Sequence, residues 1–291
     1  MADWTPAEGD VQGVVARLFV HPVKSCAAVE VQEAWVLDTG LELDRAWMVV
    51  DADGVFVSQR ELPRMALIRP QLKTYEMILR APGMLALHVA IDEVEAPVSV
   101  RVWDDQVKAY DMGAVAAQWF TDFLGRPLRL VRFDPEQKRL SSLRWTGGLE
   151  APNQFSDGYP VLVSSEASVA DLNQRLVAAG HAPVGVERFR ANVVLGGVEA
   201  FDEDRLEDIH IGTDDGPLVL RPVKPCARCP IPNIDPLSAE SSPEVGDTLM
   251  GFRRDERVGG AITFGMNAIV TEGAERRVRV GQPVWGRYRF D

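Results

Sequence analysis

Two cysteines two residues apart are the most chemically distinctive feature of the sequence. The segment Cys226-Ala227-Arg228-Cys229 lies between two prolines, so it is expected to form a rigid loop. Such a pair suits half of a zinc site, a thiol–disulfide redox pair, or a single thiolate that binds a soft transition metal. Two small buried apolar residues are the plainer alternative. The intervening Arg228 weakens that alternative, because a guanidinium attracts anions and favours a neighbouring thiolate.

Basic residues at several other points indicate an anion site. The segment 21–26, His-Pro-Val-Lys-Ser-Cys, follows a strand pattern and offers the Lys24 ammonium, the Ser25 hydroxyl and backbone amides, as phosphate-binding loops do. A solvated surface turn is the simpler interpretation. Arg45 and Arg190 precede strands, where edge charges and weak ion pairs are common, although Arg is preferred where a planar anion is clamped. The segment 58–61, Ser-Gln-Arg-Glu, has the same plain interpretation.

Several other kinds of site are not indicated. The four histidines are scattered without ligand spacing, and the sequence has no nucleophile elbow, dinucleotide fingerprint or P-loop. Only Cys26, Cys226 and Cys229 are present, which excludes a disulfide framework and an iron–sulfur centre held by four cysteines of this chain. This cysteine content fits a reducing compartment. With no secretory signal or membrane span visible, we predict a cytoplasmic location.

The overall charge limits the partners. Of 291 residues, 31 are Lys or Arg and 43 are Asp or Glu, which gives a formal net charge of −12. This balance argues against binding to nucleic acid or to an anionic membrane, because both reward clustered positive charge. An anionic ligand would therefore need a local group of cations.

Short strand patterns dominate both halves of the chain, and each half has one clear helix pattern. Apolar residues at helical spacing predict a helix over 113–124, ended by Gly125, and another over 165–179, ended by Gly180. Asp53-Gly54 between apolar pairs predicts a hairpin. The polar stretch 134–157 suggests a linker. We predict a strand-rich α+β fold with two β-barrel-like domains.

Six motifs occur together in an order that resembles the MOSC family, and within it the amidoxime-reducing components and their bacterial relatives. They are HPVKSC at 21–26, DRAWMV at 44–49, SQRELPRMALI at 58–68, SEASVADLN at 165–173, FRAN at 189–192 and KPCARCPIPNIDP at 224–236. One such motif would be weak evidence, but six in order are specific. The resemblance implies a MOSC N-terminal β-barrel-like domain over 12–133, followed by a MOSC β-barrel domain over 134–291.

The resemblance further implies a molybdenum cofactor, a molybdenum-bound pterin, held between the two domains. Cys229 matches the cysteine that binds the metal and is the implied catalytic residue. The implied cofactor-binding residues are Lys24, Ser25, Arg45, Gly158, Tyr159, Arg190, Asn192, Ala227 and Arg228. Four positions depart from the family: Gly158-Tyr159 replaces a Thr-Ser pair, Ala227 replaces a Ser, and Ala191 replaces a Pro.

The implied activity is reduction of N-hydroxylated or N-oxygenated compounds, such as amidoximes, N-hydroxylated bases and hydroxylamines. The electrons would come from a separate donor of the ferredoxin, flavodoxin or cytochrome type with its reductase. The main alternative is a molybdenum cofactor carrier or a sulfur-transfer module related to pyridoxal-phosphate-dependent sulfurases. A non-catalytic binding module is a third possibility. Small molecules are the expected ligands, with no nucleic acid or membrane partner.

Overall fold

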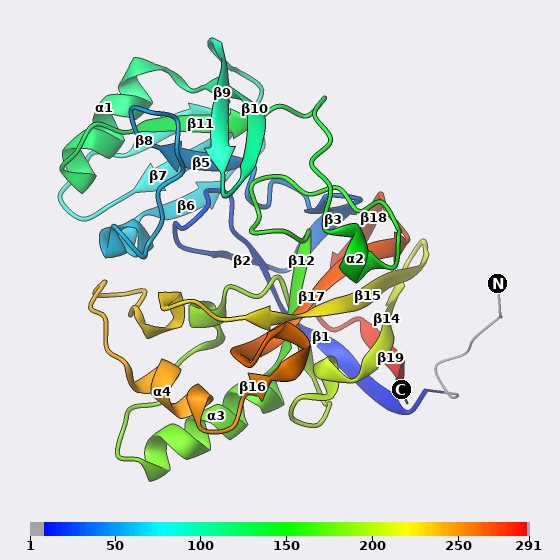
Figure 1. The fold of residues 1–291 in the computed structure, drawn as a ribbon. Helices are drawn as coiled ribbons and strands as arrows, with labels where there is room; N and C mark the ends of the chain where they lie inside the picture. Colours follow the sequence, from blue (N-terminus) through cyan, green and yellow to red (C-terminus); the bar gives the residue numbers. More distant parts are fainter. Residues whose placement is uncertain (1–8, 290–291) are drawn as a thin grey trace.

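A seven-stranded barrel forms one of the two lobes of the protein. The computed structural model describes residues 9–289, and Figure 1 shows the barrel lobe below a second lobe. The barrel closes through the pairing of its first and last strands, in the order β12 (Val161–Ser165), β13 (Val193–Gly196), β1 (Val11–Val20), β19 (Pro283–Tyr288), β14 (Leu206–Thr213), β15 (Gly216–Ala227) and β17 (Ala261–Glu272). Short strands β2 (Val29–Val31) and β16 (Arg254–Asp255) pair with β1 and β17.

Branched apolar side chains fill the inside of this barrel. Val15, Leu18, Leu195, Ile209 and Leu220 are buried in one cluster contributed by strands around the barrel. These residue types suit a pleated surface that is covered on one face. The predicted strand-rich α+β class with a β-barrel is therefore confirmed.

The second lobe contains two smaller sheets and a helix. The sheets are β5 (Trp47–Val50), β11 (Arg129–Phe133), β10 (Asp105–Asp111) and β9 (Pro97–Val102), in that order, and β6 (Arg69–Leu72), β7 (Glu76–Arg80) and β8 (Leu87–Ala90). Helix α1 (Gly113–Leu124) buries Trp119, Phe120 and Phe123 in the same core as Trp47. Gly125 ends α1 in a left-handed conformation, as its position predicts.

Strand pairing crosses the domain boundary that the sequence suggests. The division into 12–133 and 134–291 stays a prediction, but β1 lies between β13 and β19 in the barrel. In addition, β3 (Glu33–Leu37) pairs with β4 (Gly40–Leu41) and with β18 (Arg276–Arg279). Strands β1, β3 and β4 are thus built into the same lobe as the C-terminal strands.

Three α-helices follow the second lobe along the chain, which corrects the expectation of one helix per half. They are α2 (Leu143–Thr146), α3 (Glu166–Ala178) and α4 (Glu244–Met250). The predicted helix is α3, and its N-cap Ser165 accepts a hydrogen bond from the Ser168 N–H. Helices α2 and α4 are too short to show a periodic pattern. None of the helices within residues 9–289 has both the length and the apolar character that crossing a bilayer requires.

We predict that Gly265→Ala strongly destabilises the barrel. Gly265 has φ +74°, and a Cβ there would lie 2.6 Å from the Val163 carbonyl oxygen, where β17 meets β12. The matched control is Gly259→Ala, with φ +69° and open space around the added carbon. The left-handed backbone alone should cost about 1–2 kcal/mol. Urea unfolding should show at least ~2 kcal/mol more loss for Gly265→Ala, and equal losses would contradict the proposed clash.

Candidate functional site

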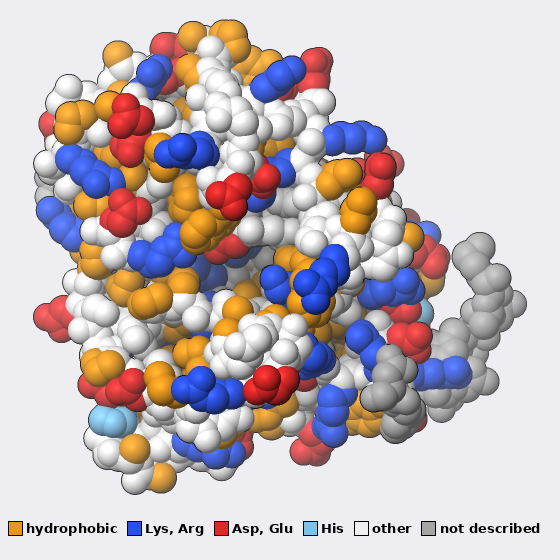
Figure 2. All heavy atoms as spheres, in the orientation of Figure 1, with side chains coloured by type: hydrophobic (Ala, Val, Ile, Leu, Met, Phe, Trp, Pro, Cys, Tyr) orange, Lys and Arg blue, Asp and Glu red, His pale blue; other side chains and the backbone are white. Residues whose placement is uncertain are grey.

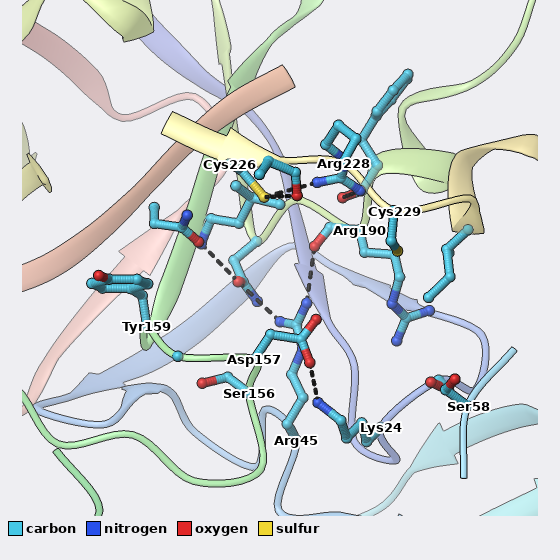
Figure 3. A pocket seen from close by; sticks show the side chains of 18 of the residues that line it. Lys24, Arg45, Ser58, Ser156, Asp157, Tyr159, Arg190, Cys226, Arg228 and Cys229 are labelled. Atoms are coloured by element: carbon cyan, nitrogen blue, oxygen red, sulfur yellow. Dashed lines mark hydrogen bonds and ion pairs between the residues drawn. The ribbon is translucent and has the colours of Figure 1, made fainter. Parts of the chain in front are cut away.

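A cleft between the two lobes brings together all ten site residues predicted from the sequence. Figure 3 shows the cleft from close by, and in Figure 2 a hollow with Lys and Arg side chains on its walls lies between the lobes. The predicted residues that line it are Lys24, Ser25, Arg45, Gly158, Tyr159, Arg190, Asn192, Ala227, Arg228 and Cys229. They come from five separate segments of the chain.

The loop 21–26 is fixed against the segment 44–47 by backbone hydrogen bonds. The Lys24 N–H donates to the Trp47 carbonyl at 2.8 Å, and the Arg45 N–H donates to the His21 carbonyl at 2.8 Å. The His21 N–H donates to Asp44 Oδ1 at 2.8 Å. Burial, with Arg45 nearby, lowers the pKa of His21 well below its usual value. His21 is therefore a neutral packing residue at neutral pH, and this loop holds Lys24 and Arg45 side by side.

Arg45 connects the two sides of the cleft. Its Nη1 donates to Asn192 Oδ1 at 3.0 Å and also to Asp44, while its Nη2 donates to the Arg190 carbonyl at 3.0 Å. Asn192 is buried, accepts from the Leu162 N–H at 3.1 Å and donates to the Phe19 carbonyl at 3.1 Å. The guanidinium of Arg45 therefore has a fixed orientation at the lobe interface.

Lys24 is a buried cation, and Arg190 is a partly buried one. Burial lowers the pKa of Lys24, while Asp157 opposes this shift by accepting a hydrogen bond from its ammonium, which also donates to the Phe155 carbonyl at 2.8 Å. Burial, followed by repulsion from Arg45, lowers the pKa of Arg190 to about 10. Arg190 Nη1 donates to the Cys26 carbonyl at 2.6 Å, and Nη2 is buried without a partner within the described chain. A buried donor of this kind can hydrogen-bond an anionic ligand.

Three cleft residues that are not glycine have a left-handed backbone. The φ angles are +67° at Ser25, +51° at Arg45 and +60° at Arg190. Each costs about 1–3 kcal/mol and persists only where the surroundings impose it, which is common at functional sites. Three of the eight non-glycine residues with positive φ in the described chain therefore line the cleft.

Two cysteines line the cleft where β15 ends. Cys226 lies in the strand, one residue before its end, and Cys229 follows the strand by two residues. Arg228 Nη1 lies 3.1 Å from Cys226 Sγ, and its Nη2 donates to the Phe189 carbonyl at 3.0 Å. Cys226 and Cys229 are half-buried free thiols. Across residues 9–289, no three side chains among His, Cys, Asp and Glu gather in a metal-binding group. The structure thus gives this cysteine pair no third ligand of that kind among these residues.

Sequence reasoning missed several residues that also line the cleft: Ser58, Arg60, Ser156, Asp157 and Asn267. Ser58 and Arg60 lie in a motif that the sequence flagged, but their types are common on surfaces. Although Asp157 is exposed, its carboxylate is partly desolvated by the cleft, which would raise its pKa, but Lys24, Arg60 and Trp103 together hold the pKa below its usual value. Asp157 immediately precedes the predicted Gly158, and only the fold places it beside Lys24.

Family comparison agrees with this arrangement. The MOSC N-terminal beta barrel domain matches residues 12–127, and the MOSC domain matches residues 150–285. The chain therefore belongs to the MOSC family, with an N-terminal MOSC barrel domain followed by a MOSC domain.

Named relatives fall into two groups. Human mitochondrial amidoxime-reducing component 1 is 32% identical over 288 residues, covering 94% of this chain and 82% of the relative. Human mitochondrial amidoxime reducing component 2 is 34% identical over 251 residues, covering 83% and 72%. Bovine molybdenum cofactor sulfurase is 31% identical over 270 residues, covering 86% of this chain but 30% of the relative. The solved YuaD protein from Bacillus subtilis is 11% identical, with 94% coverage of each chain and a TM-score of 0.42.

We predict that Asn192→Ala destabilises the protein by about 3 kcal/mol, because it leaves a buried donor and a buried acceptor unpaired. The matched control is Asn267→Ala, since Asn267 is half-buried and its side chain donates one 3.3 Å hydrogen bond to the Lys224 carbonyl. We expect a loss of about 1 kcal/mol or less for the control. Urea unfolding of both variants measures the difference. Equal losses would show that Asn192 does not hold the lobe interface together.

Proposed function

We propose that this protein is a molybdenum-cofactor-dependent oxidoreductase that reduces N-hydroxylated and N-oxygenated compounds. The observation that carries the proposal is the cleft itself, which Cys229 lines together with cations from separate segments. Similarity to the amidoxime-reducing components supports the reaction class. Amidoximes, N-hydroxylated bases and hydroxylamines are the proposed substrates.

Unpaired polar atoms in the cleft fit an anionic, polar cofactor. Within the described residues, Arg190 Nη2, Arg228 Nε, Ser58 Oγ and the Tyr159 hydroxyl are buried without partners. A pterin with a phosphate offers acceptors for all four groups, and guanidinium groups suit phosphate geometry. Burial raises the pKa of Tyr159 to about 12, so this hydroxyl stays a donor at neutral pH.

The Cys229 thiolate suits a soft metal, and we assign it as the protein ligand of molybdenum. When bound, the cofactor supplies two-electron redox chemistry at the metal. Lys24, Ser25, Arg45, Arg190 and Asn192 would hold and orient the pterin and its phosphate, together with backbone groups at Gly158 and Ala227. The two lobes limit the access of water to the cleft between them.

In the proposed reaction the substrate N–O bond breaks, two electrons and two protons are consumed, and the oxygen leaves as water. We propose that the electrons come from a separate donor protein of the ferredoxin, flavodoxin or cytochrome type with its reductase. The donor protein would return the enzyme to its reduced state after each turnover.

Sulfur transfer or cofactor carriage is the second candidate, because the match to bovine molybdenum cofactor sulfurase covers 86% of this chain. The contact of Arg228 with Cys226 Sγ provides a thiol beside a cation, which suits sulfur chemistry. This function predicts a persulfide on Cys226 or Cys229 and no reductase turnover. Mass spectrometry of the intact protein after incubation with a sulfur donor tests it.

We predict that Cys229→Ala lowers kcat at least 100-fold, whereas Cys226→Ala changes it less than tenfold. The physical reason is that Cys229 is the proposed protein ligand of molybdenum, whereas Cys226 is not. Activity is measured with benzamidoxime and hydroxylaminopurine, using dithionite-reduced methyl viologen as the donor. Molybdenum content, measured by mass spectrometry on protein produced with cofactor available, should fall in Cys229→Ala and stay near the wild-type value in Cys226→Ala. The same molybdenum content in the wild type and Cys229→Ala, or none in either, would contradict the assignment.

A further inference from the structure

A second, larger cleft adjoins the candidate cofactor site. Its volume is about 710 Å³, and it shares Arg190 and Ile231 with the first cleft. Ile231 follows Cys229 by two residues, so the shared wall lies next to the assigned metal ligand. Small-molecule sites commonly occupy about 300–1,000 Å³ at domain interfaces. The second cleft has this size and this position.

Apolar side chains from both sides line this second cleft. They include Ala27, Ala28, Val29, Val184, Ile234 and Leu237. The first three follow the loop that carries Lys24, and the others belong to the barrel lobe. A flat apolar group held between these two surfaces would bury its area without losing hydrogen bonds.

Most charged groups of the second cleft already have partners. Arg17 pairs with Glu30 at 2.7 Å and with Glu187 at 2.9 Å. Arg188 pairs with Asp235 at 2.8 Å, and Arg190 donates to the Cys26 carbonyl. Arg69, the remaining charged residue there, is exposed. The acidic side chains of the walls are therefore paired within the protein, so the apolar side chains dominate recognition there, and Arg69 and Arg190 alone among these lining residues keep an uncompensated charge.

We propose that the second cleft is the substrate-body subsite, which binds a neutral, planar aromatic or apolar group. The reducible nitrogen group of the same molecule would reach past Arg190 and Ile231 toward Cys229. This inference rests on the proposed function for its choice of substrate. It goes further by dividing the substrate between two clefts, and it predicts preference for N-hydroxylated aromatics over small hydroxylamines.

Ala28→Trp tests the subsite by filling it. The probe is 2-naphthamide, a neutral planar amide that is not an N-hydroxylated substrate, and its binding is measured by calorimetry. We expect at least a tenfold higher Kd in Ala28→Trp and no change in the control Ala178→Trp, since Ala178 is exposed on α3 outside the cleft. Leu237→Asp provides a second variant that folding should tolerate, because Leu237 is 73% exposed. It should also weaken binding.

Kinetics separate the two proposals. With the cofactor-loaded protein, Ala28→Trp should raise KM for benzamidoxime at least tenfold and leave KM for hydroxylamine unchanged. If 2-naphthamide does not bind the wild type, or binds the wild type and both cleft variants equally, the subsite is wrong. An equal rise in KM for the small and the aromatic substrate also overturns it. Binding without any reductase activity would support the subsite and overturn the proposed function alone.

Discussion

The removal of neighbouring cations from water is the constraint on which the rest of the site depends. Burial lowers the pKa of Lys24 and Arg190, which shows that the fold pays desolvation energy to hold them there. Lys24 donates a hydrogen bond to the Phe155 carbonyl, and Arg190 donates one to the Cys26 carbonyl. Arg45 in turn donates to the Arg190 carbonyl. A carbonyl satisfies a donor without cancelling its charge. Asp157 and Asp44 pair with Lys24 and Arg45, so among these three cations the positive field of the cleft rests mainly on Arg190, inside a protein of net charge −12.

Both lobes are needed to sustain that field. The loop with Lys24 and the segment with Arg45 join the second lobe to the barrel. Arg190 and Asn192 lie directly before barrel strand β13. Arg45 contacts both Asn192 and Arg190, so separating the lobes would break the contacts that orient the cations. Cys229, from a fourth segment just past β15, lines the same cleft as these cations.

Local patterns in the sequence predicted local structure well. Helices α1 and α3 follow from apolar spacing and their terminal residues, and Gly54, with φ +74°, lies in the predicted turn. The partners of β1 were beyond such reasoning, since β13 and β19 are distant in sequence. The site residues could be predicted because six ordered motifs indicated a family resemblance, and that resemblance identified the residues together. Asp157 and Ser58 were missed because neither residue type is unusual in a loop, and only folding brings them into the cleft that Lys24 lines.

The place of β1 between β13 and β19 has a consequence for synthesis on the ribosome. β1 is among the earliest strands translated, yet its partner β19 spans Pro283–Tyr288. At roughly 5–20 residues per second, β1 waits tens of seconds with an unpaired edge. During that interval its apolar residues are open to strand exchange with other nascent chains. Chaperone dependence and expression yield should therefore respond more to the length of this delay than to the final stability of the barrel.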